Sequence, residues 1–178
     1  METARAILLR RYRFSENSLI VVWITDRHGK VKTSVRGATK PGGLFSGRLE
    51  LFSESEIAFK PSRGELHVLT EVAPLPVPAL PASYLTMLAA SYFSELCDLC
   101  TEPMHPLPEL HDLLIRAFGF LRKEDPTHRA VEHFEEELAR ILGIRDPSVP
   151  AHYSLARLLR RLPESRRQLL ERIPGTAS

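Results

Sequence analysis

The side chains in this sequence that can do recognisable chemistry are cations grouped around a glycine-rich loop. Lys32 and Arg36 lie on an alternating, β-rich run that continues directly into Gly37 and Lys40. Lysine and arginine bind phosphate groups, and each such contact releases condensed counterions from a polyanion. The segment therefore predicts a polyanion-binding edge. The candidate cations are Arg11, Arg13, Lys30, Lys32, Arg36, Lys40 and Arg48.

Covalent catalysis is not expected from the other reactive side chains. The chain has no G-x-x-x-x-G-K-[ST] run for nucleotide hydrolysis, because Gly37–Gly47 lacks the lysine that would follow the second glycine. The seven histidines have no companion nucleophile or carboxylate in a recognisable motif. We therefore expect a binding protein without enzymatic activity or a cofactor. A triad assembled from residues distant in the sequence is the enzymatic alternative.

The two cysteines, Cys97 and Cys100, are spaced as C-x-x-C. Two thiolates do not complete a four-ligand zinc site, and no paired histidines follow to supply the other ligands. Because the segment has helical periodicity, we expect two buried, reduced thiols that act as small hydrophobes and bind no metal. A redox or metal role is the alternative.

Charge is distributed unevenly along the 178 residues, although the net charge is only +2. Residues 1–76 hold 12 Lys and Arg against 8 Asp and Glu, residues 77–150 hold 6 against 12, and residues 151–178 hold 6 against 2. This asymmetry favours a local anion-binding surface, with a solvated mixed-charge face as the alternative. No run approaches the length of a membrane helix, so we expect a cytoplasmic protein that does not contact the membrane.

The first half of the chain has the period of β-strands. Lys32 and Arg36 are expected on one face of their strand, and Trp23 inside the core. Tyr12, Phe14 and Phe45 are candidates for stacking against nucleic-acid bases. Five short strands with glycine-marked turns predict a small antiparallel barrel. The expected strands are Thr3–Phe14, Leu19–Thr25, Lys30–Arg36, Leu44–Lys60 with an irregular middle at residues 53–56, and Glu65–Leu75.

Four prolines within Pro74–Pro81 mark a stiff linker, so we expect one domain at residues 1–76 and a helical domain at 77–178. The helical domain should contain a three-helix bundle over 81–143 and basic helices over 151–173. Its expected helices are Pro81–Thr101, Leu107–Lys123, Thr127–Leu142, Tyr153–Leu162 and Pro163–Ile173.

The third of these helices is expected to carry its acidic residues, Glu132 and Glu135–Glu137, on its outer face. Six arginines follow in the last two helices. They either pair with Glu135–Glu137 and keep the surface soluble, which we prefer, or extend the polyanion-binding surface. The six are Arg157, Arg160, Arg161, Arg166, Arg167 and Arg172.

The order of these features resembles the bacterial RecO family of recombination mediators over nearly the whole chain. The specificity of this resemblance lies in the order and spacing of short motifs. The matching segments are Ala6–Leu9, Tyr12, Ser15–Ile20, Trp23–Gly29, Val35–Ala38, Leu49–Phe52, Tyr92–Leu96 and Phe134–Gly143.

The resemblance implies an α+β protein with an N-terminal OB-fold barrel followed by a helical domain. It also implies binding of single- and double-stranded DNA, annealing of complementary strands, and help in loading RecA during recombinational DNA repair at the bacterial nucleoid. The implied partners are RecR and the acidic, hydrophobic C-terminal tail of single-strand binding protein (SSB). The alternatives are an adaptor that bridges RecR or SSB with little DNA binding, and an OB-fold that acts on RNA.

Two departures from the family pattern limit what the resemblance implies. Many members insert a four-cysteine zinc module after the third helix, whereas here the basic helices follow within about ten residues of Gly143. We therefore expect a shortened member without that zinc. The family also presents an arginine just before the Phe-Glu pair, at a position linked with the SSB tail, and this chain has Glu132 and His133 there.

Overall fold

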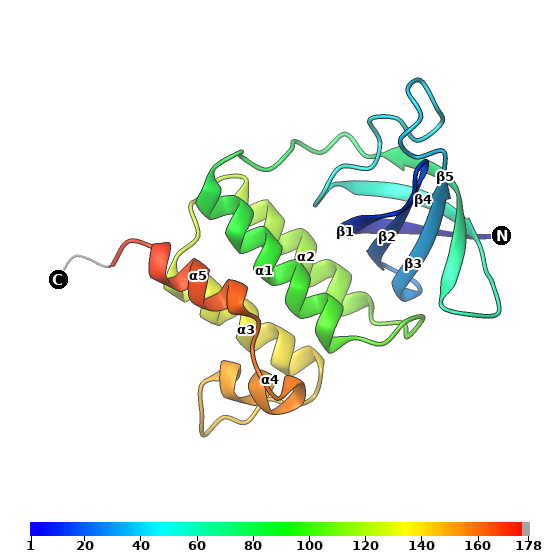
Figure 1. Cartoon of the computed structure of the whole chain (residues 1–178). Helices are drawn as coiled ribbons and strands as arrows, with labels where there is room; N and C mark the ends of the chain where they lie inside the picture. The colour runs from blue at the N-terminus through cyan, green and yellow to red at the C-terminus, as the bar shows by residue number, and fades with distance from the viewer. Residues whose placement is uncertain (176–178) are drawn as a thin grey trace. The chain divides into compact units, whose positions relative to one another are not determined.

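A computed structural model describes residues 1–175, which form two compact units (Figure 1). The barrel unit consists of Met1–Ala79 and Thr101–Asp112, and the helical unit consists of Leu80–Cys100 and the chain from Leu113 onward. The linker between them coincides with the proline-rich segment, but the inclusion of Thr101–Asp112 in the barrel unit was not expected.

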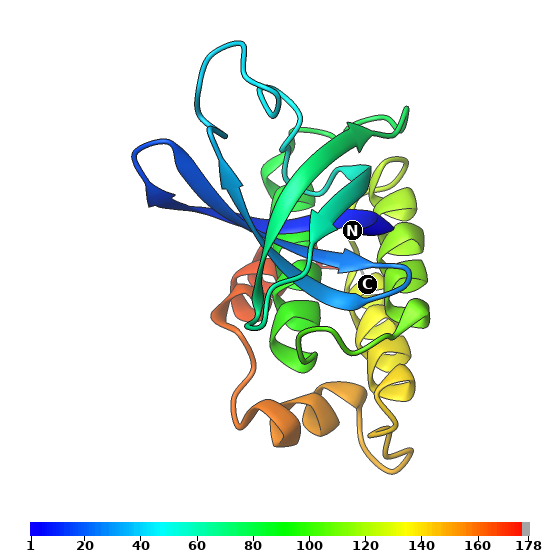
Figure 2. The same cartoon turned by 90° about the vertical axis from the view of Figure 1, so that its right-hand side faces the viewer.

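Five strands form a closed barrel in the order β1-β2-β3-β5-β4 (Figure 2). The β3–β5 pair is parallel and every other pair is antiparallel, which is the closure of an OB-fold. The expected OB-fold is confirmed, but the barrel is not wholly antiparallel, because strands that are not consecutive in the sequence meet where it closes. The strands are β1 (Glu2–Ser15), β2 (Ser18–Thr25), β3 (Gly29–Arg36), β4 (Glu54–Lys60) and β5 (Leu66–Pro74).

The barrel interior is filled by apolar side chains from alternate strand positions. Leu8, Trp23 and Val31 lie opposite one another on β1, β2 and β3 and belong to one buried cluster. The Trp23 indole Nε1 donates a hydrogen bond of 2.9 Å to Thr33 Oγ1, which satisfies the only polar atom of this side chain. Trp23 is therefore part of the core, as predicted.

The fourth strand begins later than the sequence pattern predicts. Residues 37–53 form a loop of successive turns, and β4 starts at Glu54, within the polar run that was expected to interrupt the strand. Ser55 is buried and Glu56 is exposed, so the polar residues follow the strand period themselves. Because the buried residue Ser55 is polar, the alternation of buried and exposed positions cannot be recognised from the hydropathy of the sequence.

The β2–β3 turn is packed against the segment that joins the first two helices. Gly29 has a φ of +66°, and a Cβ there would lie 1.8 Å from the carbonyl oxygen of His105. Met104 N donates a 2.8 Å hydrogen bond to the carbonyl of Lys30, and Lys30 also bridges to Pro103. These backbone contacts explain why Thr101–Asp112 belongs to the barrel unit.

Five helices follow the barrel strands in the sequence (Figure 1). Their ends lie within about three residues of the expected ones. The third helix begins as predicted, because Thr127 caps it by accepting a 3.1 Å hydrogen bond from Ala130 N. The helices are α1 (Tyr84–Cys100), α2 (Pro108–Leu121), α3 (His128–Ile141), α4 (Ala151–Leu159) and α5 (Glu164–Arg172).

Glu135 was expected on the outer face of α3, and this prediction is wrong. Its side chain is 1% exposed and lies between α1 and α5. Tyr92 Oη donates to Glu135 Oε1 at 2.7 Å, and the Arg166 guanidinium contacts both carboxylate oxygens. A carboxylate can be buried here because its charge and its lone pairs are matched. Burial, and then the neighbouring Glu135 carboxylate, raise the pKa of Tyr92.

Within residues 1–175 neither cysteine forms a disulfide, and the two lie in different environments. Cys97 is fully buried, and burial raises the pKa of its thiol. Cys100, at the end of α1, is half-buried. The expectation of two buried thiols is therefore confirmed for Cys97 and only partly for Cys100.

Candidate nucleic-acid interface

The β1–β2 hairpin extends beyond the barrel and exposes a continuous basic and aromatic segment (Figure 2). All five residues from Arg10 to Phe14 are exposed. Side chains alternate between the two faces of a strand, so Arg10, Tyr12 and Phe14 lie on one face and Arg11 and Arg13 on the other. The hairpin therefore presents cations on both of its faces.

The first face of the hairpin continues across the sheet. Cross-strand register places Tyr12 beside Ile20 and Ser34, and Arg36 lies opposite Ser18 at the same end of the sheet. Lys32 and Arg36 are both on this outer face of β3, because the intervening Val35 points into the barrel cluster. We call this surface, made of Arg10, Tyr12, Phe14, Lys32 and Arg36, the outer hairpin face.

The second face of the hairpin borders a cleft of about 380 Å³. Arg11 and Arg13 line it together with Thr39 and Glu50 of the long β3–β4 loop. The Arg11 guanidinium donates a hydrogen bond to the carbonyl of Leu49, so one of the two cations is tied to that loop. We call this surface the inner hairpin face.

The glycine-rich loop that follows β3 is held beside the hairpin turn. Thr39 Oγ1 donates a 3.2 Å hydrogen bond to the carbonyl of Glu16. Within the loop, Lys40 N donates to the carbonyl of Gly37 at 3.1 Å, and Gly37 has the positive φ of +68° that this turn requires. Lys40 is exposed, so the loop brings a further cation to the hairpin end of the barrel.

The cations of this end differ in how far acidic groups neutralise them. Lys32 Nζ lies 3.2 Å from Glu65 Oε2. The Arg10 guanidinium lies 5.3 Å from the centre of the Tyr12 ring, a cation–π distance. No ion pair is found for Arg13, Arg36 or Lys40 within residues 1–175. These three are therefore the cations most available for phosphate.

Two residues that the sequence suggested for this surface lie in the interior. Lys30 is 7% exposed, since the segment around Pro103 and Met104 pairs with its backbone. Phe45 is also 7% exposed and belongs to the barrel cluster, because the β3–β4 loop folds back over the barrel. Because both side chains are buried, Lys30 is not available as a phosphate ligand and Phe45 is not available as a stacking platform, contrary to the sequence prediction.

Arg48 lies apart from the hairpin. It lines a hollow of about 1020 Å³ together with Arg5 and Arg27, and the carboxylates Glu56 and Glu71 line the same hollow. Its Nη1 donates to the carbonyl of Val72 at 3.4 Å. The mixed charge makes this hollow a weaker phosphate site than the hairpin end.

Comparison with known protein families covers most of the chain. A family model described as "Recombination protein O N terminal" matches residues 1–76, and one described as "Recombination protein O C terminal" matches residues 81–148. The chain belongs to the RecO family. The first match covers the barrel strands, and the second ends before α4.

Curated RecO relatives are similar over most of this chain. The protein named DNA repair protein RecO from Pasteurella multocida is 29% identical over 140 residues, which cover 78% of this chain and 58% of the relative. The one from Rhodopirellula baltica is 31% identical over 147 residues, 78% of this chain and 52% of the relative. The chain thus spans little more than half the length of these RecO proteins.

The helical unit of this RecO-family chain contains a second candidate site. A largely apolar pocket of about 370 Å³ lies between α1, α2 and α3. Phe93 and Phe134 stack at 4.1 Å and form part of its wall. Arg116, Arg129 and His133 line it as well. The pocket therefore combines an apolar interior with basic groups, within one unit.

The sequence pattern missed one exposed residue of the outer hairpin face, because Arg10 was not singled out as a binding residue. The alternation from Arg10 to Phe14 is the signal that could have found it.

Among the helices of residues 1–175, none has both the length and the apolar character that crossing a membrane requires.

Proposed function

We propose that this chain is a DNA-binding recombination mediator that holds strands through the hairpin end of its OB-fold barrel. The observation that carries this proposal is the exposed run from Arg10 to Phe14, which presents cations on two opposite faces. Arg36 and Lys40 extend the basic surface from β3 and its loop. Tyr12 and Phe14 supply aromatic faces for stacking with bases.

The two hairpin faces suggest how annealing would work. Strands held on the outer and inner hairpin faces have their phosphate charges screened by arginine, while the bases that are not stacked on Tyr12 or Phe14 remain free to pair. No covalent step is needed, so we propose a mediator and not an enzyme. Binding to both single- and double-stranded DNA follows from contacts with phosphates, which carry no sequence information.

The experiment that tests this proposal is fluorescence anisotropy with labelled single-stranded DNA over a salt series, followed by an annealing assay. The variant R36E/K40E should bind more weakly, and its log-log salt slope should be shallower by about 1.4, since each contact with a single strand contributes about 0.7. The matched control is K123E/R172E, which changes the charge equally. Lys123 is exposed just after α2, and Arg172 is exposed at the end of α5, so neither residue belongs to the barrel sheet.

Two outcomes would contradict the proposal. Wild-type binding and annealing by R36E/K40E would exclude the hairpin end as the DNA surface. Weak DNA binding by the unmodified chain, with salt-resistant binding of RecR or SSB, would favour an adaptor. Labelled RNA of the same sequence, measured in parallel, distinguishes the RNA-binding alternative.

For the helical unit, we propose that the pocket between α1, α2 and α3 receives the acidic, hydrophobic tail of SSB, and that RecR and RecA join through the resulting complex. The apolar interior suits the hydrophobic residues of such a tail, and Arg129 has no ion pair within residues 1–175. Arg129 lies one helical turn before His133, so it can supply the cation that the family places next to Phe134.

A labelled peptide with the acidic, hydrophobic SSB tail tests this second site. R129E should weaken peptide binding, whereas K123E, with the same charge change outside the pocket, should not. Equal affinity of R129E and the unmodified chain would show that the tail binds elsewhere.

A further inference from the structure

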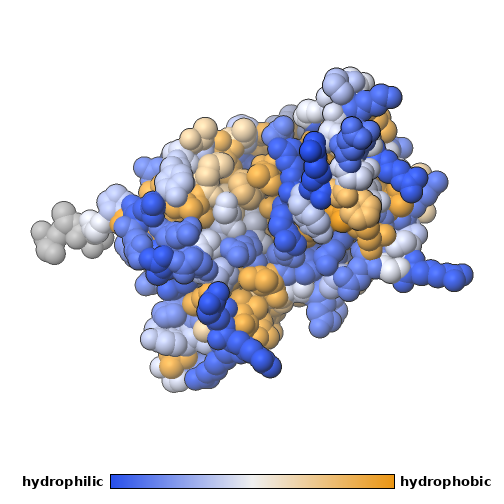
Figure 3. Space-filling view, viewed as in Figure 1, coloured by the Kyte–Doolittle hydropathy of each residue, from blue (hydrophilic) through white to orange (hydrophobic). Residues whose placement is uncertain are grey.

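Helix α4 carries an exposed basic and aromatic stripe that the barrel site does not use. Tyr153 and Arg157 lie one turn apart on one side of the helix, and Arg160, the C-cap residue with a φ of +63°, lines the same hollow. Tyr153 is 53% exposed, and the side chain of Arg157 is 70% exposed. Figure 3 shows long hydrophilic side chains extending from the region of α4.

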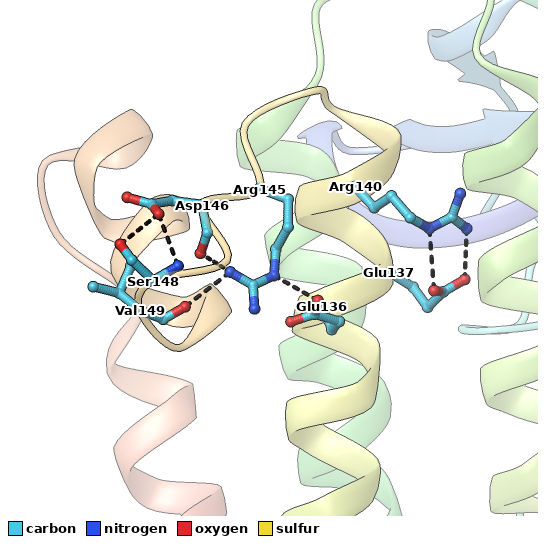
Figure 4. Close-up of polar contacts among 7 residues, drawn as sticks. All are labelled: Glu136, Glu137, Arg140, Arg145, Asp146, Ser148 and Val149. Carbon is cyan, nitrogen blue, oxygen red and sulfur yellow. Dashed lines mark hydrogen bonds and ion pairs between the residues drawn. The ribbon is translucent and has the colours of Figure 1, made fainter.

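The stripe borders a hollow of about 420 Å³, whose other lining residues are Val149 and Ala156. The loop that carries Val149 is held in place by Arg145 (Figure 4). The guanidinium of Arg145 donates to the carbonyl of Val149 at 2.8 Å and also binds the Glu136 carboxylate of α3. The wall of the hollow is therefore ordered before any ligand arrives.

The aromatic member of the stripe is also supported from one side. The Tyr153 and His152 rings lie 4.4 Å apart between centroids and are tilted by 32°. This contact limits the orientations of the Tyr153 ring while leaving half of the side chain in solvent. A fixed and exposed aromatic ring is the feature on which an unpaired base stacks.

The charges of the last two helices are not equivalent. Arg166 is neutralised by Glu135, and Arg167 contacts both Glu164 and Glu171. Arg157, in contrast, has only an exposed contact of 3.6 Å with Asp146, and no ion pair is found for Arg160 in the part of the chain that the structure describes. An exposed pair of this kind contributes little and is easily exchanged for a phosphate.

The geometry points to a second nucleic-acid site: we propose that Tyr153, Arg157 and Arg160 bind single-stranded nucleic acid. Tyr153 stacks on a base, and the two arginines contact neighbouring phosphates of the same strand. The stripe lies beyond residue 148, where the RecO-family match ends, and its residues are independent of the barrel surface. The proposal adds a strand-binding site to the helical unit and does not require the hairpin site to be correct.

Photocrosslinking locates this site directly. The full chain is irradiated with an oligothymidylate of about ten nucleotides that contains 5-iodouracil, a length within the range of known single-strand sites. Crosslinks are expected on the peptide that contains Tyr153. Their absence from that peptide, under conditions where the oligonucleotide is bound, would overturn the proposal.

Binding measurements test the roles of the residues. R157E/R160E should bind the oligonucleotide more weakly in an R36E/K40E background, with a salt slope shallower by about 1.4. In the same background Y153A should weaken binding about 5- to 150-fold, and Y153W should restore it, since stacking contributes about 1–3 kcal/mol per base. K123E/R172E added to that background is the control.

The outcomes separate the two DNA proposals. If R36E/K40E alone binds normally but R157E/R160E does not, the hairpin site is wrong and the α4 site stands. If R157E/R160E binds like the control, and its circular dichroism spectrum is that of a folded protein, the proposed α4 site is wrong. Loss of affinity for an acidic peptide, with unchanged oligonucleotide binding, would assign the stripe to a protein partner and also overturn the proposal.

Discussion

Arg166 and Glu135 form a two-point ion pair that joins α5 to α3. The Nε atom of Arg166 lies 2.6 Å from Oε1 and Nη2 lies 3.2 Å from Oε2. Glu135 is 1% exposed, so removing the arginine leaves a buried carboxylate without its counter-charge. We expect R166A to lower the free energy of unfolding by about 3–5 kcal/mol, as for other broken buried pairs. Urea denaturation measures this loss.

The control for this substitution is R161A, which removes an exposed arginine from the same part of the chain. It should change the free energy of unfolding by less than about 0.5 kcal/mol. Y92F removes one hydrogen bond to Glu135 but leaves the ion pair, so its cost should be about 1–2 kcal/mol. Equal effects of R166A and R161A would show that the pair contributes nothing to stability.

The turn at Gly29 should tolerate no side chain. A Cβ would lie 1.8 Å from a backbone oxygen of His105, and the φ of +66° is itself unfavourable for other residues. We expect G29A to destabilise the protein by about 2 kcal/mol or more. G64A is the matched control, because no atom lies within 4 Å of its Cβ and its φ is not positive. Thermal unfolding of the two variants should separate them clearly.

The strands β2 and β3 could be predicted within one residue because alternating apolar residues and a glycine turn determine them locally. The burial of Lys30, Phe45 and Glu135 could not. Each depends on a contact with a distant segment: the Pro103 region, the barrel interior and Arg166, respectively. Local periodicity reports which face of an element a residue occupies, but not what covers that face. The exposure of Arg11 and Arg13 was predictable because little covers this end of the hairpin, although Arg10 was missed.

The two thiols should react at very different rates. Cys97 is fully buried and its pKa is raised by burial, so both access and thiolate formation are suppressed. Cys100 is half-buried. We expect one equivalent of maleimide to react with the native protein, at Cys100, and a second only after denaturation. Peptide mapping identifies the modified residue, and C100S should abolish the native reaction. Rapid modification of Cys97 in C100S would contradict the packing of α1.

Acid should destabilise the barrel through His67. Its Nδ1 accepts a 3.0 Å hydrogen bond from Ser62 N, which requires an unprotonated nitrogen. Burial, and secondarily the charge of His28, lowers the pKa of His67. In the unfolded chain a histidine has a pKa of about 6.5. Below that pH the unfolded state binds a proton that the folded state resists, so stability is complete above about pH 6.5 and falls as the pH decreases.

Urea denaturation between pH 8 and pH 5 measures this dependence, and H67N provides the comparison. Asparagine can accept the Ser62 hydrogen bond but does not titrate, so the variant should lose less stability on acidification than the unmodified chain. Some dependence should remain, because burial also lowers the pKa of His111 and of His152. Parallel stability curves for H67N and the unmodified chain would show that proton uptake by His67 is not coupled to unfolding, and that the acid sensitivity arises at the other two histidines.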